Sequence, residues 1–300
     1  GICYSRMGQF DRAVEVQRRA VEFHERGSRV AYQQAIGELG TTYLLQGDFS
    51  QGLDHLRRAL AIAGEANSKN DAALWARNLA AAYHYAGRWD EAERFNNEAK
   101  RLTPEGDDRR VWNTLHEAHI AAGRRQSATA VGLFNDALKA APDQPAILWS
   151  AHAGLAVVAV AEGQPDRAEQ HFEAALATVE QTRSDLLKAD YRISFLTRLI
   201  DFYRDYVDLL IDRGRVQQAL AIVESSRARV LAERHSVAVS DRPTIGAARR
   251  LAAESDTVLL SYWLAPARSY VWIVTADGVR GVPLPPASQL ASRRTRRGPG

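Results

Sequence analysis

Few side chains in this sequence have the types and the spacing that chemistry requires. His116 and His119, in the run HEAH, lie three residues apart, so on a helix both imidazoles share one face and could hold a metal ion. The H-E-x-x-H spacing of zinc proteases is absent, however, and the helical repeat that runs through this region places both rings in the packing between helices. We therefore interpret them as satisfied core histidines and predict no metal site.

Cys3 is the only cysteine and hence the only candidate thiol nucleophile. It lies in a helical stretch, and we interpret it as a small buried hydrophobe. A single cysteine excludes an internal disulfide and is typical of a reducing compartment. The glycines of GTTYLLQGD, Gly40 to Asp48, belong to a helix and its turn and not to a phosphate-binding loop. The sequence therefore predicts no catalytic residue, no metal and no cofactor.

Composition and charge narrow the class of protein. Of the 300 residues, 46% are hydrophobic and 25% are charged, as is usual for a soluble globular protein. The net charge of +3 is supplied by four arginines near the C-terminus: Arg293, Arg294, Arg296 and Arg297. Arginine pairs elsewhere, such as Arg18/Arg19 and Arg57/Arg58, lack interleaved aromatic residues and indicate solvated helix faces. No segment resembles a signal peptide or a membrane span. We expect a cytoplasmic protein that binds neither nucleic acid nor a membrane.

The sequence repeats itself with a period close to 40 residues. The blocks MGQFDRA, QGDFSQG, AGRWDEA and EGQPDRA each contain a glycine, and two degenerate copies add two more. These glycines are Gly8, Gly47, Gly87, Gly123, Gly163 and Gly214. Because glycine adopts the backbone conformation that a tight turn between helices needs, each copy reads as two helices hinged at its glycine.

Side-chain spacing within each copy supports this reading. Before the glycine, a large residue, a small residue and a tyrosine recur three to four residues apart, as in Leu39, Gly40 and Tyr43. After it, small and large residues alternate in Ala130, Phe134 and Ala137 and in Ala168, Phe172 and Ala175. Such residues share one helix face, where small and large side chains interdigitate between stacked helices.

This pattern resembles the tetratricopeptide repeat (TPR). The resemblance covers residues 1–235, with about six repeats, and the frame places Gly1 and Tyr4 in the middle of a first helix, so we expect the first repeat to be truncated. It implies an all-α superhelical solenoid of helix-turn-helix units. The concave groove of such a solenoid is lined by the first helix of each repeat and holds peptides or partner helices.

The pattern changes after residue 235. Residues 236–256 form a linker with Pro243, Gly246 and a short helix over 247–253. Three strands are predicted at 257–264, 269–275 and 279–284, and the short turns APAR and ADG between them favour an antiparallel meander. The basic tail, residues 287–300, is predicted to be disordered.

The elements around these strands resemble the start of a CHAT domain, a caspase-like cysteine peptidase module found behind TPR arrays. The matching elements are Ser226 to Arg229, Leu259 to Tyr262, Tyr270 to Val274 and Asp277 to Gly278. The resemblance implies that residues 257–286 are the first strands of an incomplete α/β domain in a bacterial TPR-CHAT protein. It also implies a catalytic His and Cys further downstream. Since no His follows His235 and no Cys follows Cys3, this chain is not expected to be a peptidase itself.

The TPR resemblance implies which residues face a peptide or protein ligand. They are Gln34, Thr41, Arg77, Asn78, His84, Tyr85, Arg110, Asn113 and Glu117. Arg77, Asn78 and His84 are the strongest candidates, because an asparagine can bind a peptide backbone through both amide atoms and an arginine can pair with a carboxylate. Any of them could equally be an ordinary solvated residue.

Two alternatives without peptidase activity remain open from the sequence. In one, the chain is a self-contained TPR adaptor; in the other, it is the TPR sensor region of a regulator. The sequence makes no prediction of oligomeric state.

Overall fold

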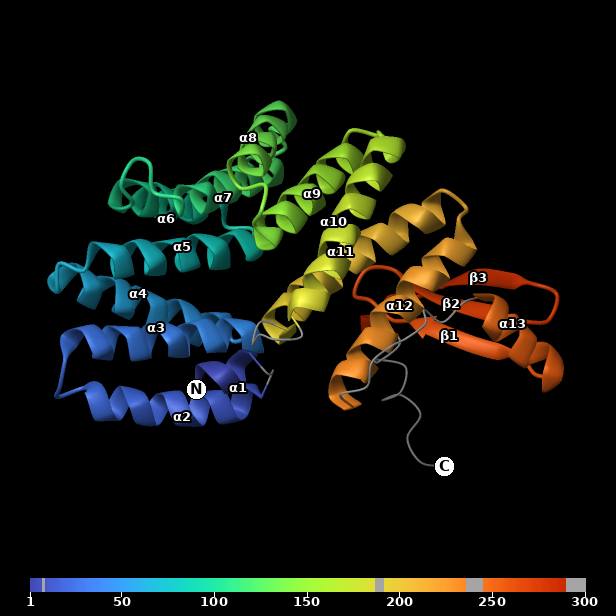
Figure 1. The fold of residues 1–300 in the computed structure, drawn as a ribbon, viewed down its shortest axis with the longest axis horizontal. Helices are drawn as coiled ribbons and strands as arrows, with labels where there is room; N and C mark the ends of the chain where they lie inside the picture. Colours follow the sequence, from blue (N-terminus) through green and yellow to red (C-terminus); the bar gives the residue numbers. More distant parts are fainter. Residues whose placement is uncertain (7–8, 187–191, 236–244, 290–300) are drawn as a thin grey trace. The chain divides into compact units, whose positions relative to one another are not determined.

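The computed structural model of the chain describes residues 1–6, 9–186, 192–235 and 245–289 (Figure 1). It divides into two compact units, Gly1–Arg198 and Leu199–Gly300. The division falls within α11 (Arg192–Asp212), whereas the sequence pattern carries the repeats on to residue 235. Within the described ranges, no helix is both long enough and apolar enough to cross a membrane.

The first unit is a row of antiparallel helix pairs, each helix packed on the next (Figure 1). Its helices are α1 (Ile2–Arg6), α2 (Phe10–His24), α3 (Arg29–Gln46), α4 (Phe49–Glu65), α5 (Lys69–Tyr85), α6 (Trp89–Leu102), α7 (Arg110–Gly123), α8 (Ser127–Ala140), α9 (Pro145–Ala161) and α10 (Pro165–Leu186). The predicted solenoid of helical hairpins is confirmed.

Glycine forms the turn within most pairs. Gly47, Gly87, Gly163 and Gly214 have φ values of 93°, 68°, 68° and 72°, in the left-handed region that side chains disfavour. After the first of these turns, the Asp48 carboxylate accepts a 3.1 Å hydrogen bond from the backbone N–H of Gln51 and caps α4. The predicted turn at Gly8 lies outside the described residues.

Gly123 does not serve as a turn residue, contrary to the sequence prediction. It is the last residue of α7, and the left-handed position falls on Arg125, with φ 59°. A Cβ atom at Gly123 would collide with the Trp89 ring of α6. This glycine is therefore required by close helix packing and not by turn geometry.

The predicted core positions are buried. Leu39, Tyr43, Ala130, Phe134, Ala137, Ala168, Phe172 and Ala175 all belong to the core. Small residues allow close approach: a Cβ at Gly40 would lie 3.0 Å from the backbone oxygen of Gly52 on α4. Cys3, predicted to be buried, is instead exposed, because it lies on the outer side of the short helix α1.

The second unit contains the rest of α11, α12 (Val216–His235), α13 (Ile245–Glu254) and the strands β1 (Leu259–Trp263), β2 (Ser269–Val274) and β3 (Val279–Leu284). The strands form an antiparallel sheet in the order β1-β2-β3, with Ser261 opposite Trp272 and Trp272 opposite Gly281. This confirms the predicted meander. Linker residues 236–244 and tail residues 290–300 lie outside the described ranges.

One face of this sheet packs on the helices. Trp272 is completely buried, and its Nε1 donates a 3.0 Å hydrogen bond to the backbone oxygen of Val216 at the start of α12. The Tyr270 hydroxyl donates to Asp208 of α11 at 2.8 Å. Burial and the Asp208 carboxylate raise the pKa of Tyr270, so the phenol stays protonated and holds the strand to the helix.

Candidate peptide-binding face of the first helices

The first helices of neighbouring pairs, α3, α5, α7 and α9, contact one another in succession. They carry all nine residues implied by the TPR resemblance. Seven of these have side chains at least partly exposed, and we call these seven the first-helix face: Gln34, Thr41, Asn78, His84, Tyr85, Arg110 and Glu117.

Thr41 and Asn78 are brought together where α3 meets α5. The Asn78 amide donates to the Thr41 hydroxyl at 3.5 Å, and that hydroxyl donates to the backbone oxygen of Gly37 at 3.0 Å. One turn earlier, Gln33 links the same helices, since its amide donates to Asp71 at 2.7 Å and accepts from the Trp75 indole. The polar contacts fix the spacing of these two first helices.

Aromatic rings connect α5 to α7 and α9. The ring centroids of His84 and His119 lie 4.9 Å apart, and His119 Nε2 is 3.1 Å from the Ser150 hydroxyl of α9. Tyr85 follows His84 and is 53% exposed. The sequence interpretation of His119 as a packed histidine agrees with these contacts.

Arg77 and Asn113 do not belong to the exposed face. Arg77 is 9% exposed, its Nη1 has no hydrogen-bond partner, and burial together with the nearby Arg109 lowers its pKa. Asn113 is fully buried, and neither atom of its side-chain amide has a partner. Its backbone oxygen accepts a 3.1 Å hydrogen bond from Asn96 of α6. Both residues lie in the packing between helices.

Arg110 is exposed in part, but its guanidinium is committed to the end of α6. Its Nε and Nη2 donate to the backbone oxygens of Thr103 and Lys100 at 3.2 and 3.3 Å. These are carbonyls that a helix end leaves without intrahelical partners. Arg110 therefore joins α6 to α7, and Glu117 does the same through a 2.7 Å ion pair with Lys100.

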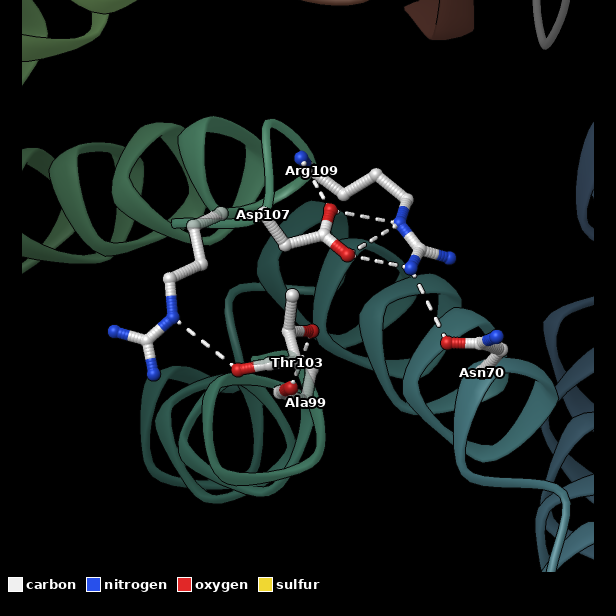
Figure 2. Close-up of polar contacts among 6 residues, drawn as sticks. Asn70, Ala99, Thr103, Asp107 and Arg109 are labelled. Carbon is white, nitrogen blue, oxygen red and sulfur yellow. Dashed lines mark hydrogen bonds and ion pairs between the residues drawn. The ribbon is translucent and has the colours of Figure 1, made fainter. Parts of the chain in front are cut away.

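The loop before α7 contains an ion pair that sequence reasoning missed (Figure 2). Asp107 accepts from the backbone N–H of Arg109 at 2.9 Å and from its Nη2 at 2.6 Å, and the same Nη2 reaches the Asn70 amide oxygen of α5 at 3.2 Å. The hydrogen bonds from Arg109 lower the pKa of Asp107 to about 2. The run GDDRR contains the signal, in an acidic turn residue two positions before an arginine.

Three arginines interpreted as solvated instead bind tyrosines of the following first helix. Arg18 Nε donates to the Tyr43 hydroxyl at 3.0 Å, and Arg57 donates to the Tyr83 hydroxyl. Arg58 likewise donates to Tyr32, an earlier residue of α3. Arg18 and Arg57 lie one repeat period apart, as do Tyr43 and Tyr83, so the period itself could have predicted these pairs.

Metal-ligating residues do not gather at this face. Over the part of the chain that the structure describes, there is no group of three or more His, Cys, Asp or Glu side chains able to hold a metal ion. The first-helix face offers hydrogen-bond donors, acceptors and aromatic rings, which suit recognition of a peptide.

Comparison with known proteins identifies the repeat. Residues 33–105 and residues 151–186 each match a family model described as tetratricopeptide repeat. The chain therefore contains TPR units, as the sequence resemblance predicts, in a solenoid followed by a small antiparallel sheet.

Solved structures share this fold. BtubC (BKLC) from P. vanneervenii has a TM-score of 0.54 at 23% identity, over 78% of this chain and 96% of that one. NprR in complex with its cognate peptide NprX has a TM-score of 0.54 at 14% identity, over 85% of this chain and 82% of that one. Aspartyl phosphate phosphatase F from Bacillus subtilis has a TM-score of 0.50 at 12% identity, over 72% and 55%. No curated protein matches the chain.

Proposed function

We propose that this chain is a protein-interaction scaffold that binds a peptide or a protein partner along the first-helix face. The observation that carries the proposal is the row of partly exposed polar and aromatic side chains on successive first helices, from Gln34 on α3 through Asn78 and Tyr85 on α5 to Glu117 on α7. An extended ligand could contact several of them at once, since neighbouring first helices pack against each other.

The residues of α5 are the ones best placed to bind. The Asn78 amide has only a long contact to Thr41, so its donor and acceptor can turn to a peptide backbone, and Tyr85 offers a largely exposed ring. Arg110 and Glu117 are engaged with α6, which makes them secondary. The structure of NprR with its cognate peptide, which has the same fold, supports a peptide as the ligand.

The test is to select peptides from a random phage library against the full chain and to measure their affinity by calorimetry. Asn78→Ala is expected to weaken binding about fivefold to tenfold, the effect of losing about 1 kcal/mol of hydrogen bonding. Tyr85→Ala should weaken it by a similar factor.

Matched controls are available on the outer helices. Asn97 of α6 and Phe23 of α2 are exposed, so Asn97→Ala and Phe23→Ala remove the same kinds of group from another surface. Equal losses in the α5 variants and the controls, or no loss in any of them, would refute binding at the first-helix face.

We further propose that the second unit is the start of a caspase-like domain, so that the intact protein couples partner recognition to cysteine peptidase activity. A contact supports this. Arg227, in the α12 segment that resembles the CHAT motif, donates at 2.8 Å to the Ser261 hydroxyl of the Leu-Leu-Ser-Tyr strand, and Ser261 donates to Glu224 at 2.6 Å. Two of the matching elements thus pack together.

The reading frame of the source DNA tests this second proposal. A frame that continues past residue 300 into strands with a His and a Cys, reactive toward a thiol probe, is the expected result. A stop codon there would overturn it and favour the adaptor or the regulator.

A further inference from the structure

Two histidines outside the first-helix face meet through their ring nitrogens. His152 lies on α9 and His171 on α10, the two helices of one pair (Figure 1). Their Nδ1 atoms are 3.2 Å apart, and the ring centroids are 5.4 Å apart with 31° between the ring planes. Both side chains are half-buried, so the nitrogens are held by packing and yet lie near solvent.

The separation of these nitrogens fits a shared metal ion. Zinc binds imidazole nitrogen at about 2.0–2.1 Å, so two imidazoles on a tetrahedral zinc have nitrogens about 3.3–3.4 Å apart. A small rotation of each ring about its Cβ–Cγ bond would point both lone pairs to one ion. Imidazole pairs suit Zn²⁺, Ni²⁺ and Cu²⁺, whereas Mg²⁺ and Ca²⁺ require oxygen ligands.

The geometry points to a two-histidine site for a late first-row divalent metal ion, formed by His152 and His171 between α9 and α10. The chain supplies two ligands, and water or a group from a bound partner completes the coordination. The helices of one TPR unit are thereby joined by the metal, which adds to their packing.

The surroundings predict how this site can be tuned. Arg167 lies four residues before His171 on α10, one helical turn away, and its guanidinium donates to Gln164 at 2.7 Å. Its positive charge opposes a dication at the site. Arg167→Gln should therefore tighten metal binding severalfold, without removing a ligand.

Calorimetry with Zn²⁺ on the full chain, produced without a polyhistidine tag, tests the site. The chain is expected to bind one equivalent, and His152→Gln and His171→Gln should each weaken binding by at least about tenfold. His55→Gln is the matched control, since His55 is exposed on α4 and its Nδ1 contacts the Gln51 backbone oxygen at 2.8 Å. Circular dichroism confirms that each variant is folded.

A second readout is the melting temperature. A ligand that binds only the folded state stabilises it, so Zn²⁺ should raise the melting temperature of the chain and of His55→Gln but not of His152→Gln. Zinc binding that is unchanged in both ligand variants, or a chain that binds no Zn²⁺ or Ni²⁺, would overturn the site and leave a simple hydrogen bond between neutral imidazoles.

Discussion

Arg77 and Asn113 show how a residue implied to face a ligand can be buried. They occupy equivalent positions of α5 and α7, and the equivalent residue of α3 is Gly37, where a Cβ would collide with the Trp75 ring. This position lies where neighbouring first helices touch, so its side chain faces the adjoining helix. The repeat frame gives the angular position of a residue, but the distance between helices decides its exposure.

Asp107 leads to a prediction about pH. Its pKa is about 2 in the folded chain against an ordinary value of 3.8, because Arg109 holds the ionised form. The pair therefore stabilises the fold above pH 4, and this contribution is lost as the pH falls towards 2. Asp107→Asn should lower the urea midpoint at pH 7, and its difference from the parent chain should shrink at pH 3. A difference that stays constant between these pH values would contradict the assignment.

At the scale of elements, the arginine-tyrosine pairs join successive repeats. Tyr83 is buried, its ring stacks on Phe95 with centroids 5.4 Å apart, and its hydroxyl accepts from Arg57. Tyr83→Phe keeps the stacking and removes the acceptor, so we expect a loss of about 0.5–1.5 kcal/mol in the free energy of unfolding. Tyr85→Phe, on the exposed neighbour, should change it by less than about 0.5 kcal/mol. Equal effects would argue against the pair.

The glycines of the repeat provide a second element-scale prediction. Gly87→Ala places a side chain at φ 68° and should destabilise the fold by roughly 1 kcal/mol. Gly123→Ala should cost about 1–3 kcal/mol because the new methyl meets the Trp89 ring. Adding Trp89→Leu should relieve the second effect but not the first. Denaturant unfolding of the two double variants measures this, and rescue of Gly87→Ala would contradict the distinction.

The same glycines show how far the sequence reaches. Period, helix pairs, core positions and the three strands were predictable because each rests on local spacing of apolar and turn residues. Gly123 was misassigned because a glycine needed for packing and a glycine needed for a turn look alike in sequence. Cys3 and the arginine-tyrosine pairs were missed for a related reason, since exposure and partners depend on which helix lies opposite.

At the scale of the whole molecule, the chain presents an unpaired sheet edge. β1 has a neighbour only on its β2 side among the described strands, and its residues Leu260 and Tyr262 are 53% and 47% exposed. Apolar edge strands promote association between copies. Leu260→Lys should therefore reduce concentration-dependent self-association, as measured by sedimentation velocity. Self-association that is absent from the parent chain, or unaffected by the lysine, would refute a role for this edge.

Hydrogen exchange on the full chain, with and without a phage-selected peptide, tests the central proposal most directly. The proposed scaffold predicts that the peptide slows exchange on the first helices, chiefly α5 and its neighbours α3 and α7, and leaves the outer helices α4 and α6 unchanged. Protection confined to the outer helices or to the sheet would contradict binding at the first-helix face.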